Sequence, residues 1–347
     1  MRYNNLGHTE IKVSELCLGS MTWGSQNTQQ EADEQIDMAL DYGVNFIDTA
    51  EMYPTTPLSK ETQGDTERII GEWISKSGRR SDVVLATKVS GKGYKNVRDG
   101  APISPASITT AIENSLRSLR TDYIDLYQLH WPNRGSYMFR KNWDYNPHAV
   151  KSETIRLDML DCLEALQSQV EKGNIRYFGL SNESAWGTAQ WLRLSEDQNL
   201  PRVATIQNEY SLLCRLYDTD LAELSVFEDV GLIAFSPLAA GLLTGKYQNG
   251  ETPNGSRKSI NSDLGKRVTE RVWPAVDAYL KIAQRHSIDP VHMALAWCSR
   301  RPFMCSSIFG ATTLRQLQHI LKASNVTLSE DCLRDISDAH KAHPMPF

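Results

Sequence analysis

One pattern recurs eight times along the chain: a short apolar stretch of the kind that forms a β-strand, followed by a longer amphipathic stretch of the kind that forms an α-helix. The short stretches are nearly continuously apolar, which is typical of parallel strands covered by helices. The expected strands are 15–19, 44–49, 82–89, 123–130, 175–181, 203–210, 231–238 and 305–310. The expected helices are 30–42, 66–77, 105–120, 154–172, 184–197, 218–228, 272–286 and 313–322. Eight such units in roughly 300 residues predict an α/β fold, a closed (β/α)8 TIM barrel, rather than an open sheet.

The segment before the first unit favours a small structure of its own. Residues 3–13, with a turn at Leu6-Gly7-His8, predict a β-hairpin that caps the bottom of the barrel. A chain of 347 residues could hold one large domain or two of ordinary size. No stretch rich in Pro, Gly or Ser divides it, so we expect one domain over residues 1–347.

Charge and cysteine usage exclude several classes of partner. The net charge of −5 provides no basic excess of the kind that nucleic acid or an anionic membrane surface requires. No run of 18 apolar residues and no signal-like apolar segment is present. The cysteines are dispersed, which predicts a reduced, cytoplasmic environment and no zinc cluster or other metal site. They are Cys17, Cys162, Cys214, Cys298, Cys305 and Cys332.

Polar residues at the strand ends are the candidate functional groups, because barrels of this type carry their chemistry in the loops after the strands. Asp48 and Tyr53 follow the second expected strand, Lys88 lies at the end of the third, and His130 ends the fourth. These four titratable groups are therefore expected to meet on one rim of the barrel. Later strands end in Ser181 and Asn182, Gln207 and Asn208, and Ser236.

The four groups together suggest proton donation to a carbonyl oxygen. Lys88 beside Asp48 predicts an ion pair, and the ammonium is expected to lower the Tyr53 pKa from about 10 toward neutrality. His130 could hydrogen-bond the same oxygen and orient it. No nucleophile has an adjacent base, so covalent catalysis is not indicated. Hydride is then the expected attacker at the carbon, and hydride requires a nicotinamide cofactor.

The cofactor cannot occupy a Rossmann site, since no strand is followed by G-x-G-x-x-G. The stretch SPLAAGLLTGKY (236–247) instead offers small residues, backbone N–H groups and Lys246, which could hold a pyrophosphate. The turn GATT (310–313) offers the start of a helix for another phosphate. The alternatives are that Lys246 is a solvated loop charge and that Gln207 and Asn208 only satisfy backbone groups at the rim.

Eight stretches match one known family. They are LGSMTWG (18–24), FIDTAEMY (46–53), ATKVSG (86–91), SLRSLRTDYIDLYQLHWP (115–132), GNIRYFGLSN (173–182), IQNEYSLL (206–213), AFSPLAAGLLTGKY (234–247) and IFGATTLRQL (308–317). On these motifs the chain resembles the aldo-keto reductases over nearly its full length, within the group that also contains the potassium-channel β subunits. The resemblance implies a barrel that binds NADPH (NADP+) and reduces a small carbonyl substrate, an aldehyde or a ketone.

Site roles follow from the resemblance residue by residue. Asp48, Tyr53, Lys88 and His130 match the catalytic tetrad, with Tyr53 as the proton donor. Further positions match cofactor contacts: the carboxamide pair Ser181 and Asn182, Gln207 at the nicotinamide, Phe235 beneath its ring, the pyrophosphate loop with Ser236, Pro237, Leu238, Ala239, Gly241, Leu243, Gly245 and Lys246, the 2′-phosphate residue Arg257, and Gly310, Thr312 and Gln316 in the last turn and helix. Trp23 and Trp131 are the expected substrate contacts; Trp131 is chosen because it directly follows His130, and the alternatives for the aromatic residues of its loop are a partner surface or ordinary loop packing.

The chain departs from the family pattern in three places. His319 and Ile320 stand where many members carry a Glu-Asn pair that binds adenine, and Arg315 could add a phosphate contact. Residues 54–67 form a longer link than usual, and residues 131–153 form an extended, aromatic-rich loop. Both segments are expected to overhang the substrate mouth.

Two functions fit these observations. The first is an NADPH-dependent carbonyl reductase. The second is a nucleotide-sensing regulatory partner of the channel β-subunit type, in which the redox state of the cofactor controls a binding surface. The complete tetrad favours the enzyme, and the sequence leaves the substrate, the oligomeric state and the strength of the preference for NADPH over NADH open.

Overall fold

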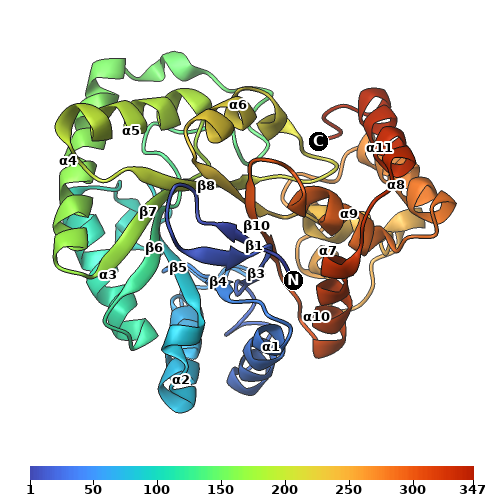
Figure 1. The fold of residues 1–347 in the computed structure, drawn as a ribbon, viewed down its shortest axis with the longest axis horizontal. Coiled ribbons are helices and arrows are strands. Elements are labelled where there is room, and N and C mark those ends of the chain that lie inside the picture. Colours follow the sequence, from blue (N-terminus) through green and yellow to red (C-terminus); the bar gives the residue numbers. More distant parts are fainter.

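The computed structural model describes residues 1–347 and contains a closed barrel of eight parallel strands surrounded by helices (Figure 1). Neighbouring strands pair in chain order, and β10 closes the barrel by pairing with β3. The strands are β3 (Leu16–Gly19), β4 (Phe46–Asp48), β5 (Val84–Val89), β6 (Ile124–Leu129), β7 (Ile175–Ser181), β8 (Val203–Glu209), β9 (Gly231–Phe235) and β10 (Met304–Phe309). The predicted (β/α)8 barrel is confirmed.

Each barrel strand is followed by a helix close to its expected position. These helices are α1 (Gln29–Asp41), α2 (Asp65–Ser77), α3 (Pro105–Leu119), α4 (Ser152–Glu171), α5 (Ala185–Gln198), α6 (Asp220–Phe227), α8 (Val272–Arg285) and α10 (Leu314–Leu321). Their starts are encoded locally, as in α1, where Thr28 and Glu31 form a reciprocal capping box. In α3, Ser104 caps the helix and Pro105 occupies its first position, where no backbone N–H is needed.

Three further helices lie outside the eight repeated units: α7 (Arg257–Ile260), α9 (Pro290–Ser299) and α11 (Glu330–Ala342). Short 3₁₀ helices are η1 (Arg80–Asp82), η2 (Arg98–Gly100), η3 (Pro147–Ala149), η4 (Leu216–Asp218), η5 (Ala239–Thr244), η6 (Gln248–Gly250) and η7 (Lys322–Asn325). None of the helices combines the length and the apolar character needed to cross a membrane.

The N-terminal hairpin closes the bottom of the barrel, as predicted. Its strands, β1 (Tyr3–Asn5) and β2 (Lys12–Ser14), pair antiparallel and lie near the centre of the view in Figure 1. Leu6, in the turn between them, is fully buried and packs in one apolar cluster with Phe46, Leu126 and Ile233 of the barrel strands. The hairpin therefore supplies the apolar layer that fills this end of the barrel interior.

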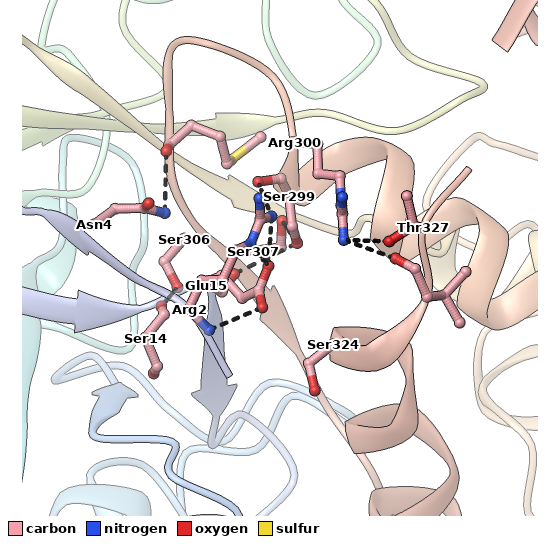
Figure 2. Close-up of polar contacts among 12 residues, drawn as sticks. Arg2, Asn4, Ser14, Glu15, Ser299, Arg300, Ser306, Ser307, Ser324 and Thr327 are labelled. Atoms are coloured by element: carbon pink, nitrogen blue, oxygen red, sulfur yellow. Dashed lines mark hydrogen bonds and ion pairs between the residues drawn. The ribbon is translucent and has the colours of Figure 1, made fainter. Parts of the chain in front are cut away.

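Polar contacts fasten the same N-terminal segment to β10 and α9 (Figure 2). Glu15 is buried, and its carboxylate accepts hydrogen bonds from the Arg2 backbone N–H at 3.0 Å and from the Arg2 Nε at 2.9 Å. Ser306 Oγ donates to the Ser14 carbonyl at 2.7 Å, and Asn4 Nδ2 donates to the Cys305 carbonyl at 2.8 Å. The hairpin is thus held by specific hydrogen bonds as well as by its apolar plug.

Candidate active site

Asp48 and Lys88 form the buried ion pair that the sequence predicts. Lys88 Nζ lies 2.7 Å from Asp48 Oδ2 and also donates to the Thr49 carbonyl at 2.7 Å. Asp48 ends β4 and Lys88 lies in β5, so the pairing of these strands brings the two side chains together. Burial lowers the Lys88 pKa, but the Asp48 carboxylate and Tyr53 outweigh this effect and raise it overall. Lys88 therefore carries its charge at neutral pH.

Tyr53 lies over this pair. Its ring centroid is 4.9 Å from Lys88 Nζ and 6.0 Å from the ring centroid of His130. Burial raises the Tyr53 pKa above its usual 10, and the opposing effect of Lys88 is not large enough to reverse this. The expectation of a lowered pKa is therefore wrong, because it counted the ammonium and left out desolvation and the Asp48 charge. Tyr53 is a protonated phenol at neutral pH.

His130 is a neutral imidazole in this setting. Burial, together with the charge of Lys88, holds its pKa well below the usual 6.5. Its Nδ1 atom is buried and has no hydrogen-bond partner. A neutral imidazole has one N–H donor and one acceptor, so His130 can offer a hydrogen bond without competing with Tyr53 as an acid.

Two glutamines complete the environment of Asp48. Gln207 Nε2 donates to Asp48 Oδ1 at 2.7 Å, and Gln128 Nε2 donates to the same oxygen at 3.2 Å. The two carboxylate oxygens of Asp48 are thereby divided between the amides and Lys88. Gln128 was not singled out from the sequence, although a glutamine inside the apolar strand YIDLYQL, two residues before His130, was the available signal.

A second carboxylate fixes the loop that carries Tyr53. Glu51 lies between Asp48 and Tyr53 in the chain and accepts two hydrogen bonds from Arg98, at 2.6 and 2.8 Å. It also accepts the Ser90 backbone N–H at 2.5 Å. The sequence reasoning missed this pair, which ties the loop after β4 to the loop after β5.

These groups open onto a cavity of about 760 Å³ at the carboxyl ends of the strands. The predicted site residues that line it are Asp48, Tyr53, His130, Trp131, Ser181, Asn182, Gln207, Phe235, Ser236, Pro237, Leu238, Gly241, Lys246, Arg257, Gly310, Thr312 and Gln316. Lys88 lies behind Asp48 and Tyr53 and is fully buried. Ala239, Leu243 and Gly245 are not in the wall of the cavity, and Ala239 and Leu243 pack in the core instead.

The two tryptophans expected at the substrate differ. Trp23 is completely buried and its Nε1 donates to Gln35 Oε1 at 3.1 Å, so the expectation that it contacts the substrate is corrected: it is a core residue. Trp131 does line the cavity, and its ring centroid is 4.9 Å from that of His130. Thr55, Thr56 and Leu58, with Phe139 and Arg140, also line the cavity, so both long loops contribute to its walls.

Asn182 presents an unsatisfied acceptor at this cavity. Its Nδ2 donates to the His130 carbonyl at 2.9 Å and to Ser181 Oγ at 3.0 Å, while its Oδ1 is buried without a partner. Ser181 Oγ in turn donates to the Gln207 carbonyl at 2.9 Å. A ligand amide N–H would satisfy the Asn182 Oδ1, which fits the carboxamide of a nicotinamide.

Cations without carboxylate partners line another part of the cavity. Lys246 is exposed and Arg257 is partly buried, and neither takes part in an ion pair; Arg257 Nη1 lies 4.0 Å from Met21 Sδ. Burial lowers the pKa of Arg257 to about 10, and the charge of Arg267 adds to this effect. Cations without carboxylate partners at a cavity fit the phosphates of a dinucleotide.

The turn at residues 310–313 and helix α10 form another wall of the cavity. Gln316 Oε1 accepts hydrogen bonds from the Thr312 N–H at 2.9 Å and from the Thr312 hydroxyl at 3.0 Å. His319 and Ile320 also line the cavity, whereas Arg315 is exposed and does not. His319 Nε2 lies 3.2 Å from Asp289 Oδ1, so this wall is polar even without the usual Glu-Asn pair.

Comparisons with known proteins agree with this geometry. The model of the aldo/keto reductase family matches residues 15–341. The chain is 43% identical to the protein tas of Escherichia coli, over all of this chain and 99% of that protein. It is 32% identical to an uncharacterized oxidoreductase, YrpG, of Bacillus subtilis, over 97% of this chain and 95% of that protein.

A plant protein is similar to the chain at the same level of sequence identity as YrpG. The chain is 32% identical to a probable voltage-gated potassium channel subunit beta of Arabidopsis thaliana, over 94% of this chain and 92% of that protein. The family match spans the whole barrel and the loops that carry the cavity. The chain therefore belongs to the aldo/keto reductase family of oxidoreductases.

Proposed function

We propose that this oxidoreductase uses NADPH to reduce aldehydes or ketones to alcohols, with Tyr53 as the proton donor. The observation that carries the proposal is the protonated Tyr53 held above the buried Asp48–Lys88 pair and beside a neutral His130. A weak acid with a cation 4.9 Å from its ring suits transfer of a proton to an oxygen that becomes negative during the reaction.

Each residue of the set has a distinct part in this proposal. Tyr53 gives its proton to the carbonyl oxygen, and Lys88 stabilises the phenolate that remains. His130 donates a hydrogen bond to the same oxygen and orients the substrate. Asp48, fixed by Gln128 and Gln207, keeps Lys88 in place. When bound, the nicotinamide supplies the hydride that these groups cannot provide.

The cavity offers residues that would hold the cofactor. Ser181 and Asn182 would bind the carboxamide, Phe235 would lie against the nicotinamide ring, and Lys246 and Arg257 would bind phosphates. The small residues from Ser236 to Gly241 would allow the backbone to approach the pyrophosphate. A preference for the 2′-phosphate of NADPH is part of the proposal, and so is a cytoplasmic location.

A regulatory role of the channel β-subunit type is the second candidate, and the similarity to the Arabidopsis protein favours it. In that case the chain would bind the nucleotide and a partner protein, and turnover would be incidental. The complete Asp48, Tyr53, Lys88 and His130 set favours the enzyme, because nucleotide sensing alone does not need a proton donor.

The test is a fluorescence titration of the purified protein with NADPH and with NADH, followed by a screen of aldehydes and ketones that records NADPH oxidation. We expect binding to shift or quench NADPH fluorescence and at least one small aldehyde to be turned over. Binding without turnover across the screen would favour the regulatory role. Absence of binding of either nucleotide would overturn the proposed function.

A further inference from the structure

One carboxylate at the end of β8 holds two arginines from two different segments of the cavity wall. Glu209 Oε1 accepts a hydrogen bond from Arg267 Nε at 2.8 Å, and Glu209 Oε2 accepts one from Arg140 Nη1 at 2.5 Å. Arg140 belongs to the long loop after β6, and Arg267 lies between α7 and α8. Both arginines line the cavity, and all three side chains are nearly buried.

The two arginines differ in how many hydrogen bonds their guanidinium groups donate. Arg267 also donates to the Leu264 carbonyl at 2.7 Å and to Ser236 Oγ at 3.4 Å. Arg140 makes no hydrogen bond other than the one to Glu209, and its Nε is buried without a partner. Two guanidinium charges face one carboxylate, so the group carries an excess positive charge. Burial lowers the pKa of Arg140 and the neighbouring Arg267 adds to this effect, although Glu209 opposes it.

Arg140 lies at the catalytic end of the cavity. Its neighbour Phe139 packs edge-on against Trp131, with ring centroids 6.4 Å apart, and Trp131 directly follows His130. Glu209 comes two residues after Gln207 on the same strand, and Gln207 donates to Asp48 at 2.7 Å. Residues two apart on a strand point to the same face, so the Glu209 carboxylate lies about 7 Å along the strand from Gln207, toward the loops.

We propose that Arg140 is a specificity-determining residue that binds a carboxylate carried by the carbonyl substrate. The inference rests on the proposed function, since it assigns a substrate class to that same site. A guanidinium that is anchored through one nitrogen keeps the others for a second planar anion, and the Arg–carboxylate pair is directional and charge-assisted. Trp131, Phe139 and Leu58 supply apolar walls for the part of the substrate between the carbonyl and the carboxylate.

The test compares 4-carboxybenzaldehyde with benzaldehyde in wild-type protein and in Arg140→Gln. We expect the wild type to have the higher kcat/KM for the carboxylated aldehyde, mainly through a lower KM. In Arg140→Gln the ratio of the two kcat/KM values should fall by about 10- to 100-fold, the range for one hydrogen bond to a charged group. Arg140→Lys should restore part of the ratio, because it keeps the charge and loses the planar geometry.

Two controls separate substrate recognition from other roles. Glu209→Gln loosens the anchor but keeps Arg140, so the ratio should stay closer to wild type than in Arg140→Gln. If Arg140 only holds its loop, both aldehydes would lose kcat/KM equally in Arg140→Gln, and the proposal is overturned. If Arg140 instead contacts a cofactor phosphate, the Kd for NADPH would rise in the variant while the ratio stays unchanged, which also overturns it.

A binding measurement keeps the inference testable without turnover. Calorimetric titration with 4-(hydroxymethyl)benzoate and with benzyl alcohol should show tighter binding of the carboxylate in the wild type, and the difference should be lost in Arg140→Gln. Equal affinities in the wild type would contradict the carboxylate site. If the wild type binds the carboxylate more tightly than benzyl alcohol but reduces no aldehyde, the proposed function is contradicted and the carboxylate site is not.

Discussion

At Tyr53, burial and a nearby charge shift the pKa of the phenol in opposite directions. Burial disfavours the phenolate, and Lys88 favours it; the net result is a pKa above 10. For the proposed role as proton donor this is useful, because the phenol would stay protonated until the substrate oxygen develops negative charge. Lys88 would then contribute most at the point where the phenolate forms, which is where stabilisation accelerates a reaction.

This balance predicts the pH dependence of the reductase reaction. In the proposed reaction Tyr53 acts in its protonated form, so its raised pKa should keep it active throughout the neutral range, and activity should be lost only as the pH rises through that pKa. His130, whose pKa is well below 6.5, should not titrate in this range either. We expect kcat for aldehyde reduction to be nearly flat between about pH 6.5 and 9. A fall in kcat with a midpoint near neutrality would show that the Tyr53 pKa is lowered instead.

At the level of single residues, the sequence predicts which residues form the candidate site better than it predicts what surrounds each of them. Asp48, Tyr53, Lys88 and His130 could be found because they end or follow apolar strands. The direction of the Tyr53 pKa shift could not, because desolvation depends on what surrounds the phenol in three dimensions. The contacts that Gln128 and Glu51 make were likewise missed, because each partner comes from a distant part of the chain.

At the level of elements, the N-terminal hairpin should stabilise the fold without contributing to the candidate active site. Leu6 is fully buried at the closed end of the barrel, so Leu6→Ala should leave a cavity there. We expect the free energy of unfolding to fall by about 2–4 kcal/mol, measured by chemical denaturation. NADPH affinity should be unchanged, since the hairpin lies at the opposite end of the barrel from the cavity that is proposed to bind the cofactor.

Leu157→Ala is the matched control for this substitution. Leu157 lies on α4 and is largely exposed, so the same change should cost less than about 0.5 kcal/mol. Equal costs for the two variants would mean that Leu6 does not fill the barrel as described.

The barrel elements were predictable because each strand and its helix carry their own periodic pattern. The errors come from contacts or conformations that no local pattern encodes. The seventh strand was expected to reach residue 238, but it ends at Phe235, and Ser236 adopts a φ of 56° that leaves the strand. Helices α9 and α11 do not follow barrel strands, so counting strand-then-helix units passed over them, although Asp289-Pro290 is a clear helix start for α9.

One buried carboxyl group outside the cavity should make the free energy of unfolding of the whole molecule depend on pH. Glu67, on α2, accepts a hydrogen bond from Thr87 Oγ1 at 2.6 Å, and burial raises its pKa to about 7. In the unfolded chain the same carboxyl has a pKa of about 4.5. Between these two values the folded protein holds a proton that the unfolded chain has lost, so stability falls as the pH rises through this window.

Glu67→Gln removes this dependence and keeps a hydrogen-bonding side chain. Between pH 5 and pH 7.5 the wild type should lose about 2 kcal/mol of unfolding free energy that the variant keeps. The free energy of unfolding of the variant minus that of the wild type should therefore be about 2 kcal/mol larger at pH 7.5 than at pH 5. Chemical denaturation of both proteins at the two pH values measures it. A difference between variant and wild type that does not change with pH would contradict the raised pKa.

For the whole chain, the sequence allowed the barrel, its hairpin and its family to be predicted; the structure confirms the barrel and the hairpin, and the comparisons confirm the family. One domain over residues 1–347 remains a prediction. The Arg140–Glu209–Arg267 group could not be predicted, because its members are 58 and 69 residues apart in the chain and meet only above the folded barrel. Features that depend on the meeting of distant loops are therefore where the structure adds most.

The most direct test of the central claim is the Tyr53→Phe substitution, which removes the hydroxyl and keeps the ring. NADPH affinity should stay close to wild type in the fluorescence titration, because the cofactor contacts are unaffected. The rate of aldehyde reduction should fall by about 10²–10⁴-fold, the range for loss of a general acid. A variant that binds NADPH and reduces the aldehyde at the wild-type rate would show that Tyr53 is not the proton donor.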